Sequence, residues 1–266
     1  MKNRQEGDSG AAAGPPFQPG WLLAGLIGFG IGFGFVEAAV VVDLRAILSP
    51  TVAQANRGSV GEVLPLIAFN RPGRSDPVAM RLMRIEVLRE VATLVMLAGV
   101  GLAAGRTFLQ RFAAFLLAFG VWDLCYYVSL KALIGWPGSV WTWDVLFLVP
   151  VPWAAPVLAP AMVALAMVAA SSAVLVWEAN GSPLRVAPGD WAAIVVGALI
   201  LIGAFCWNWR DIAAGRRPNP FPWRLFGTGL AIGLGGVGRA AVVSRLDKAA
   251  GPGRHELPLP DRTRAG

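Results

Sequence analysis

The stretch WLLAGLIGFGIGFGFVEAAVVV, residues 21 to 42, has a single ionisable residue, Glu37, among apolar and small side chains. A helix of roughly 20 such residues crosses the hydrocarbon core of a bilayer, which is about 30 Å thick. The run is too long for the apolar region of a cleaved signal peptide, and Glu37 interrupts it late. We therefore expect residues 21 to 42 to form a transmembrane helix that stays in the mature protein.

The rest of the chain has the same character, with 56% hydrophobic residues, 15% charged residues and a mean hydropathy of +0.59. These values exclude an ordinary soluble domain. Asp76 and Pro77 are suited to be the N-cap and the first residue of a second helix, which ends near Gly105. Further apolar runs predict helices at about 112 to 131, 157 to 177, 191 to 209 and, shorter and rich in glycine, 225 to 238. The sequence thus predicts an all-α, polytopic membrane bundle of about six transmembrane helices.

We expect one transmembrane domain, residues 21 to 243, between disordered tails at 1 to 20 and 244 to 266, which mix charges with Gly, Ala and Pro. One further apolar run, DVLFLVPVPW at 144 to 153, has about half the length needed to cross, and its prolines oppose a regular helix. A short re-entrant or interfacial segment fits this run, because protein or water can then satisfy its backbone.

The polar residues sort to one side of the membrane when the helices cross it alternately. We call the side on which the first helix begins side A and the opposite side side B. The ionisable groups and the tyrosine of interest all fall in the half near side B, while the half near side A holds mostly Ala, Val, Leu, Gly and Ser. The residues expected to line a polar cavity open toward side B are Glu37, Glu86, Arg89, Glu90, Asp123, Tyr127, Lys131 and Asp144.

Asp123, Tyr127 and Lys131 are spaced by four residues, so they share one face of the third helix. Asp123 lies close to the membrane midplane, where an acid costs roughly 2.5 to 3.5 kcal/mol and usually faces the bundle interior with a partner. The expected partner is Arg89, Lys131 or a tyrosine hydroxyl.

Two carboxylates and a guanidinium crowd one turn of the second helix at Glu86, Arg89 and Glu90. Such a turn suits a proton carrier, and with Asp123 the two glutamates are candidate ligands for a divalent cation, Mg²⁺ or Ca²⁺. The alternative is that the turn lies among lipid headgroups with its charges solvated.

Other features have simpler explanations. GLGGVG at 233 to 238 matches the dinucleotide-binding pattern but follows no strand, so we reject that site. Cys125 and Cys206 lie in apolar helices and indicate no disulfide framework. The only histidine, His255, is in the expected tail, which argues against haem, zinc-hydrolase and histidine acid/base chemistry.

The chain has a net charge of +7 but no basic patch interleaved with aromatic residues, so we expect attraction to membrane lipids, including anionic ones, and no nucleic-acid partner.

The distribution of basic residues predicts the orientation. About eleven Lys and Arg residues fall on side B against three in the side A loops, which places side B in the cytoplasm. The use of Arg over Lys, with abundant Ala, Gly and Val, indicates a bacterial inner membrane.

Three function classes remain open. A transporter of a small polar solute or cation is favoured by the intramembrane acids, and a chain of this size would need a homo-oligomer or a larger membrane complex. A membrane enzyme acting on a phosphate-bearing lipid would use the divalent cation and Arg89. A non-catalytic accessory or assembly subunit would use the same charges for helix pairing.

Overall fold

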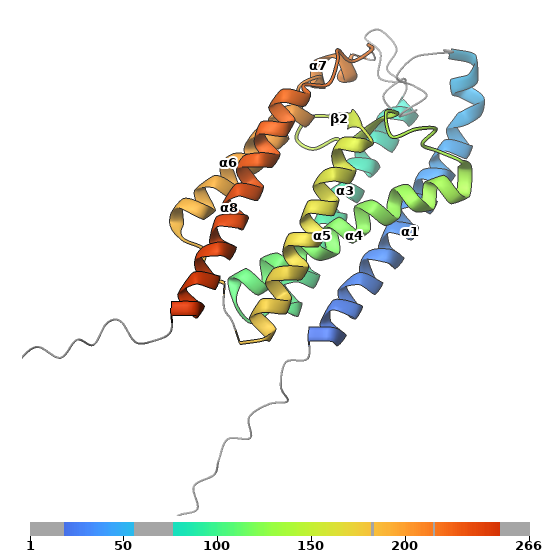
Figure 1. The fold of residues 1–266 in the computed structure, drawn as a ribbon. Helices are drawn as coiled ribbons and strands as arrows, with labels where there is room; N and C mark the ends of the chain where they lie inside the picture. The colour runs from blue at the N-terminus through green and yellow to red at the C-terminus, as the bar shows by residue number, and fades with distance from the viewer. Residues whose placement is uncertain (1–18, 56–76, 182–183, 215, 251–266) are drawn as a thin grey trace, which may run out of the picture.

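A computed structural model describes residues 19–55, 77–181, 184–214 and 216–250 (Figure 1). These residues form seven helices and one pair of strands. Their bounds are Pro19–Ala55 (α1), Pro77–Ala104 (α3), Phe108–Ile134 (α4), Trp143–Phe147 (β1), Trp153–Pro156 (β2), Leu158–Ala179 (α5), Pro188–Phe205 (α6), Trp209–Ala213 (α7) and Trp223–Ala250 (α8).

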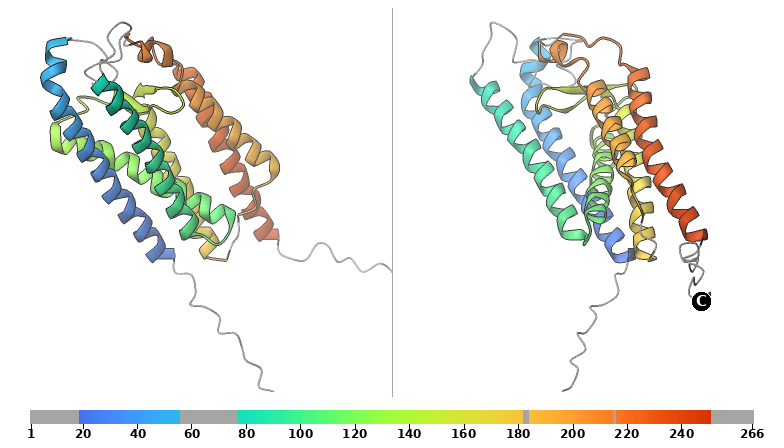
Figure 2. Two further views of the ribbon diagram at one scale, coloured as in Figure 1. Left: turned by 180° about the vertical axis from the view of Figure 1, so that it is seen from behind. Right: turned by 90° about the vertical axis from the view of Figure 1, so that its left-hand side faces the viewer.

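Six of these helices, all except the short α7, are long and apolar enough to cross a membrane. They run alternately up and down, so α1 begins and α8 ends at one end of the bundle, while the strands and α7 lie at the other (Figures 1 and 2). The chain is therefore an integral, multi-pass membrane protein with an all-α bundle, as its sequence predicts. Side A is the end where α1 begins.

Several helix ends differ from the prediction: α1 continues to Ala55, well past 42, and α6 ends at Phe205, before 209. The third helix, α4, begins at Phe108 because Thr107 caps it: the Gln110 backbone N–H donates to Thr107 Oγ1 at 3.2 Å, and Gln110 Oε1 accepts from the Thr107 N–H. The last helix, α8, runs from Trp223 to Ala250, well beyond the expected 225 to 238, so residues 244 to 250 are helical and not part of a disordered tail. Pro77 opens α3 as expected.

The tails at 1 to 18 and 251 to 266, and the N-cap expected at Asp76, lie outside the described residues.

The apolar run at 144 to 153 forms an antiparallel hairpin, which the sequence did not predict. Trp143 pairs with Pro156 and Asp144 with Ala155, and residues 148 to 152 connect the strands. The prolines exclude a helix, as expected, but the backbone satisfies its own hydrogen bonds across the two strands. The hairpin β1–β2 lies at the side B end of the bundle (Figure 1).

Helix α4 is the centre of the larger part of the bundle, because α1, α3 and α5 all pack against it. Close approach of α1 to α4 depends on two glycines. A Cβ at Gly30 would lie 2.8 Å from the Val121 side chain, and a Cβ at Gly34 would lie 2.6 Å from the Trp122 carbonyl oxygen. Gly28 and Gly32, on the other side of the helix, meet nothing within 4 Å. The small residues Gly30 and Gly34 thus allow the close packing of α1 on α4.

Helices α6 and α8 form a separate pair, closely packed through glycines. A Cβ at Gly197 would lie 2.6 Å from the Gly233 backbone nitrogen and 2.7 Å from the Gly229 carbonyl oxygen. The GLGGVG segment therefore lies within α8 and forms part of its contact with α6. The pair joins the rest of the bundle at side B, where Phe205, Phe221 and Phe226 pack with Ala155 and Ala159, and at side A, where the Trp191 ring of α6 lies 5.6 Å from the Phe108 ring of α4.

Candidate functional site

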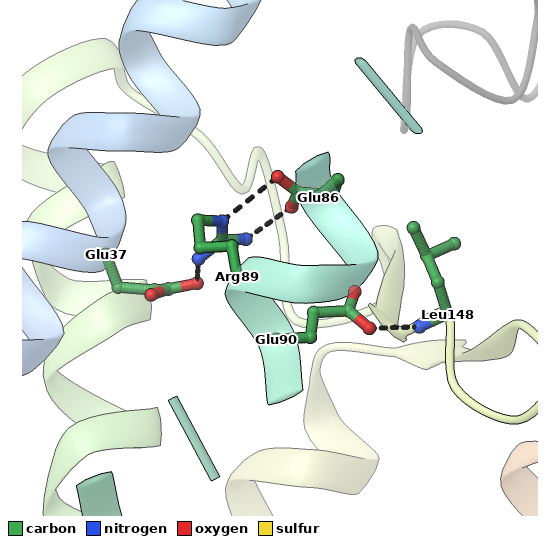
Figure 3. Close-up of polar contacts among 5 residues, drawn as sticks. All are labelled: Glu37, Glu86, Arg89, Glu90 and Leu148. Atoms are coloured by element: carbon green, nitrogen blue, oxygen red, sulfur yellow. Dashed lines mark hydrogen bonds and ion pairs between the residues drawn. The ribbon is translucent and has the colours of Figure 1, made fainter. Parts of the chain in front are cut away.

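The centre of the site is Arg89 of α3, which binds two carboxylates (Figure 3). Its Nε donates to Glu86 Oε2 at 3.0 Å and its Nη2 to Glu86 Oε1, one turn away, so the fork of the guanidinium meets one carboxylate with two bonds. Its Nη1 donates to Glu37 Oε1 on α1. The side chains of Glu37 and Glu86 are 11% and 10% exposed and that of Arg89 is 22% exposed, so the charges are largely withdrawn from solvent.

This ion pair joins two helices that have little other contact. Helices α1 and α3 each pack against α4 rather than against one another. Sequence reasoning placed Glu37 and Arg89 on the same side of the membrane but did not pair them. The structure pairs them because α4 holds the two helices at the distance that two long side chains span.

Glu90 follows Arg89 and points to a different element. Its Oε2 accepts a hydrogen bond of 2.8 Å from the backbone N–H of Leu148, in the connection between the hairpin strands (Figure 3). Glu90 is 8% exposed and forms no ion pair within the part of the chain that the structure describes. Its carboxylate thus meets a neutral donor, a contact that sequence patterns do not reveal because the donor is backbone.

Asp144 in β1 and Tyr127 on α4 make the second contact between the hairpin and the helices. The Tyr127 hydroxyl donates to Asp144 Oδ2 at 2.9 Å, and Asp144 is 2% exposed. Burial raises the pKa of Asp144 to about 6, although the Tyr127 hydrogen bond and the charge of Arg45 act in the opposite direction. Asp144 can therefore change its protonation near neutral pH.

Asp123 does not have any of the partners that its sequence position suggested. Arg89 is engaged by Glu37 and Glu86, and Tyr127 by Asp144, and none of the described residues forms a hydrogen bond or ion pair with Asp123. Asp123 lies within electrostatic range of Asp144. Its carboxylate is the acid of the site without a hydrogen-bond donor among those residues.

Lys131 is separate from this group. It is exposed, and its Nζ donates to the carbonyl oxygens of Gly135 and Pro137 at 3.1 and 2.8 Å. These bonds satisfy carbonyls beyond the C-terminal end of α4. Lys131 shares a helix face with Tyr127, as predicted, but its hydrogen bonds are to the backbone that follows the C-terminal end of α4.

Two residues that sequence reasoning did not assign to the site belong near it. Arg45 lies over the Trp136 ring, with its guanidinium carbon 4.4 Å from the ring centroid, and it acts electrostatically on Asp144. Arg45 follows Glu37 by eight residues, a helical repeat that could have indicated it. Tyr126, next to Tyr127, lies within electrostatic range of Arg89, Asp123 and Asp144.

The proposed divalent site gains no geometric support from the described residues, in which no three Asp, Glu, His or Cys side chains are arranged to hold a metal ion. Both oxygens of Glu86 are bound by Arg89, and one oxygen of Glu90 by Leu148. Both cysteines are free thiols.

Comparisons of the chain with protein-family models, with curated proteins and with solved structures find no match. The site must therefore be interpreted from its own geometry.

Proposed function

We propose that this membrane protein transports a small polar solute or cation, with the residues around Arg89 and Asp144 as its binding site. The observation that carries the proposal is an excess of acids over paired cations. Five carboxylates, those of Glu37, Glu86, Glu90, Asp123 and Asp144, gather near side B, and Arg89 pairs with only two of them.

An excess of buried carboxylates favours a positively charged ligand. Taking charged acids out of water is costly, and a proton or a cation relieves that cost. Glu90 and Asp144 are met by the neutral donors Leu148 N–H and Tyr127 O–H, and Asp123 lacks even a neutral donor among the described residues. These three acids are the groups that a proton or a solute cation would occupy, while Arg89 holds Glu37 and Glu86 in place.

The test is flux through reconstituted protein. Proteoliposomes containing wild type and a trapped pH-sensitive dye would be given small amines, amino acids and monovalent cations in turn, and solute-dependent proton movement recorded. We expect Asp123→Asn to reduce the rate at least tenfold, because it removes the unpaired charge. The matched control is Asp43→Asn, an exposed acid on α1, which should keep the wild-type rate. Equal rates in wild type and Asp123→Asn would contradict the assignment of Asp123.

An accessory or assembly subunit is the second candidate, and one contact favours it. The Arg89–Glu37 ion pair joins α1 to α3 and would serve helix pairing without any ligand. In that case Asp123→Asn and Glu90→Gln would lower the melting temperature and no solute would move. The lipid enzyme is less favoured, because the guanidinium that would meet a phosphate is bound by two carboxylates.

A further inference from the structure

The hairpin β1–β2 is held in place by contacts with other elements. A two-stranded hairpin is at best marginally stable alone in water. On one side Val145 and Leu148 pack with Met83 and Val87 of α3. On the other side the hairpin joins the aromatic cluster at the ends of α6 and α8, where the Trp153 and Phe205 rings stack with centroids 6.2 Å apart. The hairpin therefore bridges the two parts of the bundle.

Only two buried polar side chains of the helices hold the hairpin in the described part of the chain, and each of these contacts uses an acid of the proposed site. Glu90 of α3 accepts from Leu148 N–H in the connection, at 2.8 Å, and Tyr127 of α4 donates to Asp144 in β1, at 2.9 Å. The two contacts are at opposite ends of β1. Lifting the hairpin would break both and would leave Glu90 and Asp144 free to take other partners.

The same oxygens would serve a ligand. A cation that binds Glu90 or Asp144 competes with the Leu148 N–H and the Tyr127 O–H for them, since a hydrogen bond from a neutral donor is weaker than one from a charged donor. The hairpin lies at the side B end, with its connection against Glu90 (Figures 1 and 3).

We infer that the hairpin β1–β2 is a movable cap over the site, held closed by the Glu90–Leu148 and Tyr127–Asp144 hydrogen bonds and opening toward side B. This inference rests on the proposed transport function and adds its control: the hydrogen bonds of Glu90 and Tyr127 to the hairpin set how often the carboxylates of the site are exposed. In the structure the cap is closed. A cation binds to the carboxylates of the site when the hairpin moves away from the helices.

The experiment measures how fast a cysteine on the α3-facing side of the cap reacts with a water-soluble maleimide. Val145→Cys is placed in a background with Cys125→Ala and Cys206→Ala. Val145 is 8% exposed and faces α3, so the closed cap protects it. Glu90→Ala and Tyr127→Phe each remove one of the two bonds. We expect each to raise the labelling rate about fivefold to tenfold, the range for losing one buried hydrogen bond.

Two controls separate cap opening from general loosening. Glu90→Gln keeps an oxygen that can accept from Leu148 N–H, so its labelling should stay near the reference rate. A cysteine at Leu97, fully buried in α3 away from the hairpin, should stay unlabelled in every variant.

Unchanged labelling of Val145→Cys in both Glu90→Ala and Tyr127→Phe would overturn the cap, and so would parallel labelling at Leu97→Cys. The labelling assay needs no flux. A failed cap therefore remains distinguishable from a failed transport function, which the Asp123→Asn flux measurement decides.

Discussion

Arg89 is the residue on which the charge balance of the site depends. Its guanidinium meets Glu86 with two bonds and Glu37 with one, and all three groups are largely buried. Removing one partner of a buried ion pair destabilises a protein more than replacing both partners with apolar residues, because the remaining charge is buried without compensation.

We expect Arg89→Ala to destabilise the protein by about 3 to 5 kcal/mol, since two carboxylates lose their cation. Glu37→Gln should cost less, because Arg89 keeps Glu86. The measurement is thermal unfolding in detergent. Arg216→Ala is the control: the Arg216 side chain is 63% exposed and its pair with Asp211 should be worth less than about 1 kcal/mol. Similar melting temperatures for Arg89→Ala and Arg216→Ala would show that the Arg89 pairs are not stabilising.

The Asp144 carboxyl makes stability depend on pH. Its pKa is raised from 3.8 to about 6 by burial, so between these values the folded state binds more proton than the unfolded state. Stability contributed by Asp144 is therefore present at low pH and is lost as the pH rises toward and past 6, by about 3 kcal/mol in total at about 1.4 kcal/mol per unit.

The melting temperature of wild type should accordingly fall from about pH 4 to about pH 6, the interval between the two pKa values, and Asp144→Asn should remove this part of the fall. Tyr127→Phe deletes a hydrogen bond that lowers the pKa of Asp144, so it should move the fall to higher pH. Identical pH profiles for wild type and Asp144→Asn would contradict the raised pKa.

At the scale of helices, close packing depends on which face a glycine occupies. Gly34→Ala would place a Cβ 2.6 Å from the Trp122 carbonyl oxygen of α4, whereas Gly32→Ala meets nothing within 4 Å. We expect Gly34→Ala to destabilise by about 1 to 3 kcal/mol through overpacking. Gly32→Ala should be neutral or stabilising, because alanine is the better helix former. Thermal unfolding of the two variants side by side tests this, and the reverse order would show that α1 does not pack on α4 through Gly34.

At the scale of the whole molecule, the six spans place the α5–α6 loop and the hairpin end on opposite sides of the membrane. The charge bias predicts that side B is cytoplasmic. In a background with both native cysteines replaced by alanine, we expect Asn180→Cys, at side A, to react in intact cells with an impermeant maleimide. Val140→Cys, at side B and 50% exposed, should react only after permeabilisation. The opposite pattern would invert the orientation while leaving the fold unchanged.

The sequence by itself determined the membrane class, the six spans and the side on which the acids gather. Those features depend on the length of apolar runs and on the position of each residue along a helix, both of which are local. The alternating glycines from Gly28 to Gly34 are small enough for close helix packing, but only the structure shows that Gly30 and Gly34 face α4 while Gly28 and Gly32 do not.

Only the tertiary structure decided which groups meet. Glu37 and Arg89 are 52 residues apart, and Glu90 and Leu148 are 58 apart, so neither contact has a local pattern. The Leu148 donor is a backbone N–H, which every residue but proline carries, and the pairing of β1 with β2 depends on neighbours from α3, α5, α6 and α8. The partners of the buried charges follow from how the helices pack around α4. A buried acid has little water to bond with, so its hydrogen-bond donors are those that packing brings within reach.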